Sequence, residues 1–168
     1  MLTNGIESSE VDMDPSEDAF RAMLRYFGLL RRTMEPFFAG YGISVSQWGM
    51  LRVLLRAHRE GHAGLPLMDL GERLLVRPPS VTGVVRRLTT MGLVKAISST
   101  EDHRVRLVSL TAKGKRLVGT VSGAHRERVR EIYAALDEQE LAGLSGSLGK
   151  LCHHMEEIGR GTGKKEQA

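Results

Sequence analysis

The residues with the clearest chemical potential in this chain are nine arginines and lysines gathered between positions 76 and 116. Only two acids, Glu101 and Asp102, lie among them, so this segment carries +7 and the rest of the chain carries −3 of the net +4. A positive patch confined to a quarter of the chain favours binding to a polyanion such as nucleic acid. A solvated basic face is the alternative that charge alone leaves open.

Motifs for other chemistry do not stand out. The chain has no phosphate-binding glycine loop, Ser/His/Asp signature, zinc-protease motif or Cys-x-x-Cys pair, so we expect neither an enzyme nor a cofactor. The single cysteine, Cys152, excludes an intramolecular disulfide. His58 and His62 flank a glycine, and the adjacent His153 and His154 diverge by about 100° on a helix, so we expect no metal site. Redox sensing by Cys152 and metal sensing by the histidines remain open alternatives.

Composition places the chain among folded proteins that do not span membranes. Hydrophobic residues make up 41% and charged residues 26% of its 168 residues, as in ordinary globular domains. No apolar run approaches the roughly 20 residues that cross a bilayer, and no secretory signal is visible. We therefore expect a cytoplasmic protein.

Both ends of the chain are predicted to be helical. Asp14 and Pro15 are typical of a helix start, and residues 14–42 and 112–158 each carry apolar side chains at alternating spacings of three and four. Residues 1–13, which are rich in acids, and residues 159–168 are expected to be flexible tails. The two stripes contain these residues: Phe20, Met23, Phe27, Leu30, Met34 and Phe37, and then Leu141, Leu144, Leu148, Leu151, Met155 and Ile158.

The middle of the chain, residues 43–111, has a different pattern. Ser44 and Gln47 form a capping box that opens a helix, and a short helix is expected over residues 67–75. Prolines interrupt at 78 and 79, and a third helix follows to Gly92. Residues 93–98 and 105–110 are predicted to form a β-hairpin with a charged tip. The fold class is thus mainly α, with some β: a winged helix-turn-helix between terminal helices.

This order predicts how DNA would be bound. The second helix of such a unit presents small or polar residues near its N-terminus to base edges in the major groove. Pro79, Ser80, Thr82 and Gly83 are small, and Arg86 lies one turn further on the same face. The hairpin would place Arg104 in the flanking minor groove, where negative potential is concentrated.

These residues resemble the MarR (multiple antibiotic resistance regulator) family of transcriptional regulators over about residues 20–158. The similarity includes Ser46-Gln47-Trp48 and Leu70-Gly71-Glu72-Arg73-Leu74. It continues with Pro79-Ser80-Val81-Thr82, and its strongest part is Asp102-His103-Arg104 with Leu110-Thr111 and Gly114, which is similar to the wing signature of that family. The order and spacing of these pieces make the resemblance specific.

The resemblance implies an obligate homodimer whose terminal helices, 14–42 and 112–158, form the dimerisation domain. It also implies that Arg104 enters the minor groove while Asp102 orients it. Two positions depart from the family pattern: Gly83 stands where arginine is frequent, and Arg86 where an acid is frequent. The operator sequence of the family therefore does not carry over.

The resulting hypothesis is a ligand-responsive regulator, most simply a repressor, that binds a pseudo-palindromic operator in double-stranded DNA as a homodimer and is released by a small, aromatic or phenolic effector. A redox- or metal-sensing regulator of the same fold, or a helical interaction module, is the alternative. The expected DNA-binding residues are Arg77, Pro79, Ser80, Thr82, Gly83, Arg86, Arg87, Asp102, His103, Arg104 and Arg106. Where the family places a ligand pocket lie Met34, Phe37, Phe38, Trp48 and Arg52, for which core packing is the alternative.

Overall fold

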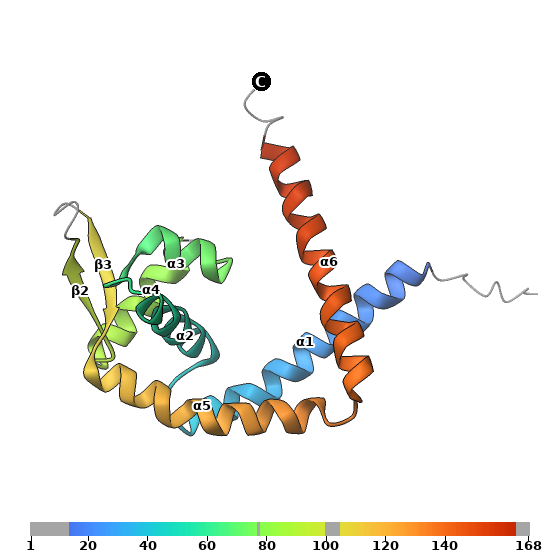
Figure 1. Ribbon diagram of the computed structural model, residues 1–168, viewed down its shortest axis with the longest axis horizontal. Coiled ribbons are helices and arrows are strands. Elements are labelled where there is room, and N and C mark those ends of the chain that lie inside the picture. Colours follow the sequence, from blue (N-terminus) through green and yellow to red (C-terminus); the bar gives the residue numbers. More distant parts are fainter. Residues whose placement is uncertain (1–13, 77, 100–104, 164–168) are drawn as a thin grey trace, which may run out of the picture. The chain divides into compact units, whose positions relative to one another are not determined.

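A computed structural model describes residues 14–76, 78–99 and 105–163 (Figure 1). These residues form two compact units, one up to Val118 and one from Gly119 onward. None of the described helices is both long and apolar enough to cross a membrane. The structure describes neither the expected acidic tail, residues 1–13, nor residues 164–168.

The first unit contains seven complete elements and the start of an eighth that continues beyond it. In chain order its helices and strands are α1 (Pro15–Ala39), α2 (Val45–Arg59), β1 (Leu65–Pro66), α3 (Leu67–Leu74), α4 (Pro78–Thr90), β2 (Val94–Ser98) and β3 (Arg106–Leu110), followed by the start of α5 (Ala112–Tyr133). The second unit holds the remainder of α5 and α6 (Glu138–Gly163). The predicted order of helix, turn, helix and hairpin is confirmed.

Side-chain caps explain where three of these helices begin. Asp14 accepts one hydrogen bond from the Ser16 hydroxyl and another from the Ser16 backbone N–H, the second at 2.9 Å. The two bonds together lower the pKa of the Asp14 carboxyl group. The Ser44 N–H donates to Gln47 Oε1 at 2.8 Å, and the Gln47 N–H donates to the Ser44 hydroxyl oxygen at 3.2 Å. The predicted capping box is therefore present. Asp137 and Glu140 make the same reciprocal arrangement at the start of α6.

The sheet has three antiparallel strands in the order β1-β3-β2. The hairpin pairs Val94 with Leu110 and Ser98 with Arg106, and β1 adds Leu65 opposite Val108. The two-residue strand β1 was not expected, because so short a segment carries no alternating pattern. It ties the segment before α3 to the hairpin, so the wing is joined directly to the helix-turn-helix.

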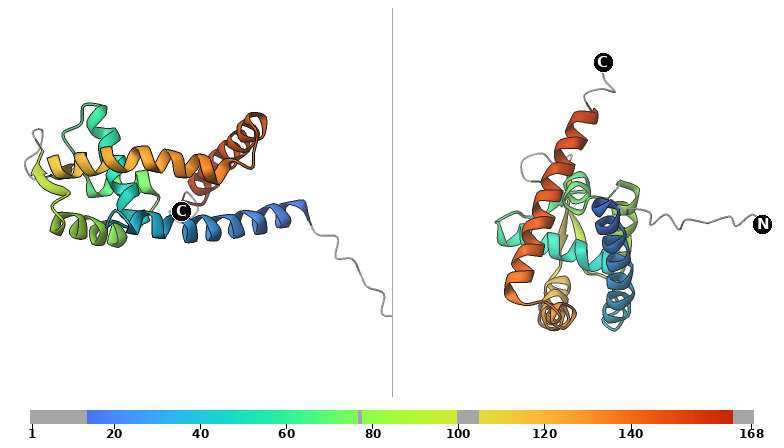
Figure 2. Two further views of the ribbon diagram at one scale, coloured as in Figure 1. Left: turned by 90° about the horizontal axis from the view of Figure 1, so that it is seen from below. Right: turned by 90° about the vertical axis from the view of Figure 1, so that its right-hand side faces the viewer.

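The core of the first unit lies between the three central helices and the sheet. Leu51 of α2, Leu70 of α3, Leu88 of α4 and Val94 of β2 are almost completely buried. Figure 1 and the left view of Figure 2 show α2, α3 and α4 grouped beside the hairpin. Burial of these aliphatic side chains is the main force that holds the recognition unit together.

The second unit differs from the expectation at its end. Helix α6 continues to Gly163, past the predicted boundary at residue 158. The glycines that suggested fraying lower helix propensity by about 1 kcal/mol each but do not forbid the helical conformation.

The turn between α3 and α4 contains an unusual leucine. Leu75 has φ 54° and ψ 38°, the left-handed conformation, and its side chain is 92% exposed. This conformation lets the Val76 N–H reach the Gly71 carbonyl oxygen at 3.1 Å and so ends α3. An L-residue with a side chain is strained there, whereas glycine is not.

We therefore expect Leu75→Gly to raise the free energy of unfolding by about 1 kcal/mol. Leu75→Val is the matched control and should lower it, because a β-branched side chain tolerates this conformation least. Urea unfolding at one protein concentration measures both. A Leu75→Gly protein no more stable than the parent would show that the turn is not strained.

Candidate DNA-binding surface

The two faces of α4 have opposite character. Val81, Val84 and Leu88 are buried against the core and define the inward face. Because residues follow each other at about 100° around a helix, Gly83 and Arg86 fall on the opposite side. The exposed or half-buried residues of this outward face are Pro79, Ser80, Thr82, Gly83, Arg86 and Arg87. The structure thus brings together six of the predicted DNA-binding residues.

The start of α4 includes both prolines that were expected only to interrupt the chain. Pro78 is the first helical residue and Pro79 the second. Their lack of an N–H group costs nothing in the first turn, where no partner within the helix exists. Residues with small side chains therefore occupy the N-terminal turns of α4, where they keep the helix backbone accessible.

The C-terminus of α4 is fixed by side chains from the start of α5. Gly92, at φ 70°, reverses the chain, and the Leu93 N–H donates to the Leu88 carbonyl oxygen at 2.9 Å. The Thr111 hydroxyl donates to the Gly92 carbonyl oxygen at 2.7 Å, and Lys113 Nζ donates to that of Met91 at 2.9 Å. These bonds hold the end of α4 against α5.

The sequence predicts Thr111 as the cap of the helix that follows it, but it does not predict the contacts with the end of α4. Thr111 and Gly114 belong to the wing motif on which the family resemblance rests, but only the structure shows what they contact. The Gly114 N–H donates to the Thr111 hydroxyl at 3.0 Å, so Thr111 also caps α5. A Cβ at Gly114 would collide with the carbonyl oxygen of Leu93. The motif therefore joins α4, β2 and α5 at one point.

The wing is described only in part. Arg106 lies at the start of β3, is exposed, and its Nη1 donates to the Ser98 hydroxyl at 3.4 Å. The predicted site residues Asp102, His103 and Arg104 lie outside the described residues, as does Arg77. Their DNA-binding roles remain predictions from the sequence.

The arginines of α4 differ from those arginines that pair with acids. Several arginines elsewhere do so, as Arg31 does with Glu35 at 2.6 Å. Glu60 at the end of α2 is bonded by Arg56 at 2.8 Å, which lowers the pKa of this carboxyl group, and Arg73 of α3 lies 3.7 Å away. Within the described ranges, Arg86 and Arg87 pair with no acid. Their charges are thus available to an external anion.

The residues expected near a ligand pocket form a packed cluster. Met34, Phe38 and Trp48 are buried, Phe37 is half-buried and Arg52 is exposed. The Phe38 ring lies 5.5 Å from that of Trp48 and 5.0 Å from that of Phe37, centroid to centroid. Such distances are typical of aromatic packing in a core.

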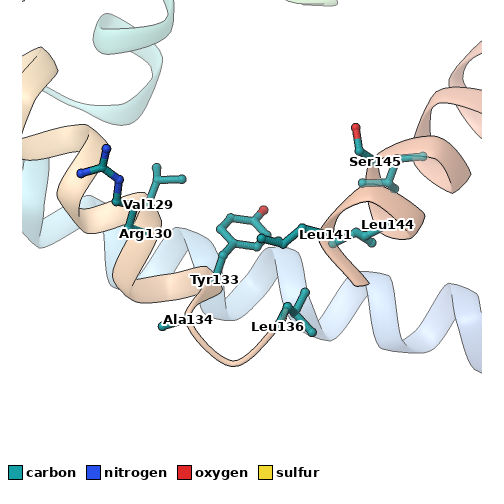
Figure 3. A pocket seen from close by; sticks show the side chains of 9 residues that line it. Val129, Arg130, Tyr133, Ala134, Leu136, Leu141, Leu144 and Ser145 are labelled. Carbon is teal, nitrogen blue, oxygen red and sulfur yellow. The ribbon is translucent and has the colours of Figure 1, made fainter. Parts of the chain in front are cut away.

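Two cavities lie elsewhere. One of about 280 Å³ lies between α2, the α3–α4 turn and α4, and is lined by Gly49, Met50, Leu74, Val76, Ser80 and Val84, among others. The other, of about 540 Å³, lies at the bend between α5 and α6 (Figure 3). Its lining is mostly apolar and includes Val129, Tyr133, Leu141, Leu144 and Leu148.

The alternatives of redox sensing by Cys152 and metal sensing by the histidines depend on which side chains surround these residues. Cys152 is exposed on α6, and His153 and His154 lie 3.5 and 3.8 Å from Glu157. Among the residues that the structure describes, no group of three or more histidine, cysteine or acidic side chains could hold a metal ion.

Known proteins share both sequence and fold with this chain. Residues 41–105 match a family model described as MarR family. The chain is similar to the homoprotocatechuate degradative operon repressor of Escherichia coli, with 26% identity over 133 residues, covering 79% of this chain and 82% of the relative.

Two solved structures extend the comparison. One is a probable transcriptional regulator from Pseudomonas aeruginosa, with a TM-score of 0.66 and 28% identity over 83% of this chain and 98% of that one. The other is a mutant MarR from E. coli complexed with operator DNA, with a TM-score of 0.72 and 21% identity over 83% and 99% of the two chains. The likeness to the second structure shows the fold alone, and together the comparisons confirm the winged helix-turn-helix.

The anchor of α4 can be tested at Gly114. We expect Gly114→Ala to lower the free energy of unfolding by about 3 kcal/mol, because the new methyl group meets a backbone carbonyl that cannot move freely. Gly119→Ala, on the same helix with open surroundings, is the control and should cause no loss. Urea unfolding compares them, and equal stabilities of the two variants would contradict the anchor.

Proposed function

We propose that this chain is a repressor of the MarR family of transcriptional regulators that binds a pseudo-palindromic operator as a homodimer and releases it when a small ligand binds. The observation that carries the proposal is the outward face of α4. It combines small side chains at the N-terminal end with two arginines that no described acid neutralises. Such a face suits the major groove.

The proposed binding mode uses two elements. Helix α4 enters the major groove, with Pro79, Ser80 and Thr82 near base edges. The wing follows the adjacent minor groove, where Arg104 enters and Arg106 contributes positive charge at its base. The bonds from Thr111 and Lys113 to the end of α4 support this mode, because they keep the helix and the wing in one rigid unit.

The dimer proposal rests on apolar faces that the single chain leaves uncovered. On α1, Phe20 is 60% exposed, and Leu24 and Phe27 are also exposed. On α6, Met155 is 70% exposed and belongs to the stripe predicted from the sequence. Large contiguous apolar surfaces on a folded chain mark interaction sites. A second copy would cover these helices, and the cavity at the α5–α6 bend adds further apolar surface of the same kind.

The dimer constrains the operator. A two-fold axis relates the two α4 helices, so they would contact equivalent half-sites about one helical turn, roughly 10 bp, apart.

The ligand proposal is broader. The name of the E. coli relative, a repressor of an operon for homoprotocatechuate degradation, supports a small effector. We place it near the cluster of Met34, Phe37, Phe38, Trp48 and Arg52, where an exposed arginine lies close in sequence to buried aromatic rings. Binding there would have to open the packed cluster, so a ligand would alter how α1 packs on α2.

Charge reversal in the α6 stripe should disrupt the dimer. We expect Leu151→Glu to dissociate or unfold it, because a carboxylate would be buried in an apolar interface. Lys150→Glu, on the opposite face of α6, changes the charge more and should leave the dimer intact. Sedimentation velocity and circular dichroism measure association and folding. A parent chain that sediments as a folded monomer at micromolar concentration would refute the dimer.

Binding to duplex DNA should depend steeply on salt. We expect the logarithm of the association constant to fall linearly with that of salt concentration, with a slope of about −0.9 per neutralised phosphate.

Arg104→Ala should weaken binding strongly while base preference at major-groove positions survives, because this arginine acts through groove shape and charge. Thr82→Ala should instead change base preference.

Arg160→Ala, far along α6, is the control and should bind like the parent. Affinities are measured by fluorescence anisotropy on a set of single-base duplex variants at fixed salt. Unchanged binding by Arg104→Ala would rule out the wing contact. Small, equal losses for each arginine removed would instead indicate a solvated basic face.

A further inference from the structure

Within the part of the chain that the structure describes, Gly83 has no structural reason to be glycine. It lies in the middle of α4, and its φ angle is not positive, unlike those of Gly42, Gly61 and Gly92. Among the described residues, a Cβ built at Gly83 would come within 4 Å of only one atom outside the neighbouring backbone, Arg87 Nη1, at 3.9 Å. That is an ordinary contact with a flexible side chain. Since glycine inside a helix costs about 1 kcal/mol relative to alanine, the chain tolerates a cost that its own packing does not require.

The other glycines of the central helices differ from Gly83. A Cβ at Gly49 would lie 3.5 Å from Leu74, and one at Gly71 would lie 3.2 Å from the Val76 carbonyl oxygen. Packing explains both. The remaining helical glycines with open surroundings lie on α1, α5 and α6, outside the three central helices. Gly83 is therefore the one glycine of α2, α3 and α4 that faces outward with room to spare.

Two arginines flank this open position. Arg86 and Arg87 follow Gly83 by three and four residues, so their side chains start one turn later on either side of it. Long side chains on a helix point toward its N-terminus and cover the preceding turn. The 3.9 Å distance from Arg87 Nη1 shows that its guanidinium does lean over Gly83. The outward face of α4 thus has a position without a side chain at Gly83, with the Arg87 guanidinium beside it and Arg86 starting on its other side.

We propose that Gly83 is the point at which the backbone of α4 approaches the base edges, and that Arg86 and Arg87 both contact bases there. This inference rests on the proposed DNA-binding function and adds to it the residues that set sequence preference. A guanidinium donates two hydrogen bonds to N7 and O6 of guanine, a contact that requires the helix to lie close to the groove floor. A methyl group at position 83 would hold the helix away and lengthen both contacts.

The proposal predicts opposite effects of one substitution on thermal stability and on DNA binding. Gly83→Ala should raise Tm by about 2 to 4 °C, because alanine is the better helix former. It should at the same time weaken binding, by about 10-fold or more, to a duplex selected by the parent protein from a random-sequence pool. Gly146→Ala is the matched control. It adds the same methyl group at an open glycine on the side of α6 away from the apolar stripe, and should raise Tm without changing affinity.

Lysine replacements test the arginines. Lysine keeps the charge but cannot make the two-pronged contact, so Arg87→Lys and Arg86→Lys should each lose preference for guanine at one position per half-site by about 10-fold. Their salt dependence should match that of the parent. An Arg87→Lys protein with unchanged base preference would show that Arg87 contacts phosphate only, and would overturn its part of the proposal.

The outcomes distinguish this inference from the function on which it rests. A parent protein that selects no duplex from the pool would overturn both. A parent that binds a selected duplex, together with a Gly83→Ala protein that binds it equally tightly, would overturn the role of Gly83 alone.

Discussion

The burial of one aliphatic face of α4 is the constraint on which the proposed DNA-binding surface depends. Val81, Val84 and Leu88 lie against the core and fix the rotation of the helix about its axis. With that rotation fixed, helical geometry alone presents Gly83 and Arg86 outward. A slip of one residue in this packing would turn these residues by about 100° and remove them from the face.

Fixing the rotation of α4 would be of little use if the helix could tilt. Bonds from Thr111 and Lys113 close the C-terminal end, and the strained turn at Leu75 sets the approach to the N-terminal end. Strand β1 joins the same unit to the hairpin. The proposed readout therefore comes from an element held at both ends, whereas α1 and α6 carry exposed apolar side chains that the proposed dimer would cover.

Much of this arrangement follows from the sequence, but not all of it. Capping residues such as Ser44 and the apolar periodicity of α4 act locally, so the elements and the faces of the helix could be predicted. The alternation on α1 also predicted its helix, although it could not show that Phe20 is exposed while Phe38 is buried. The collision that forces glycine at position 114 and the space around Gly83 depend on atoms distant in sequence. Only coordinates reveal such contacts.

Interference by guanine N7 methylation tests whether α4 binds in the major groove, because that atom lies on the floor of this groove. A duplex selected by the protein is methylated sparsely, and the bound and free fractions are sequenced. If α4 binds in the major groove, methylation should block binding at guanines in two symmetric half-sites about one helical turn apart. Interference confined to adenine N3 in the minor groove, or none at any guanine, would contradict it.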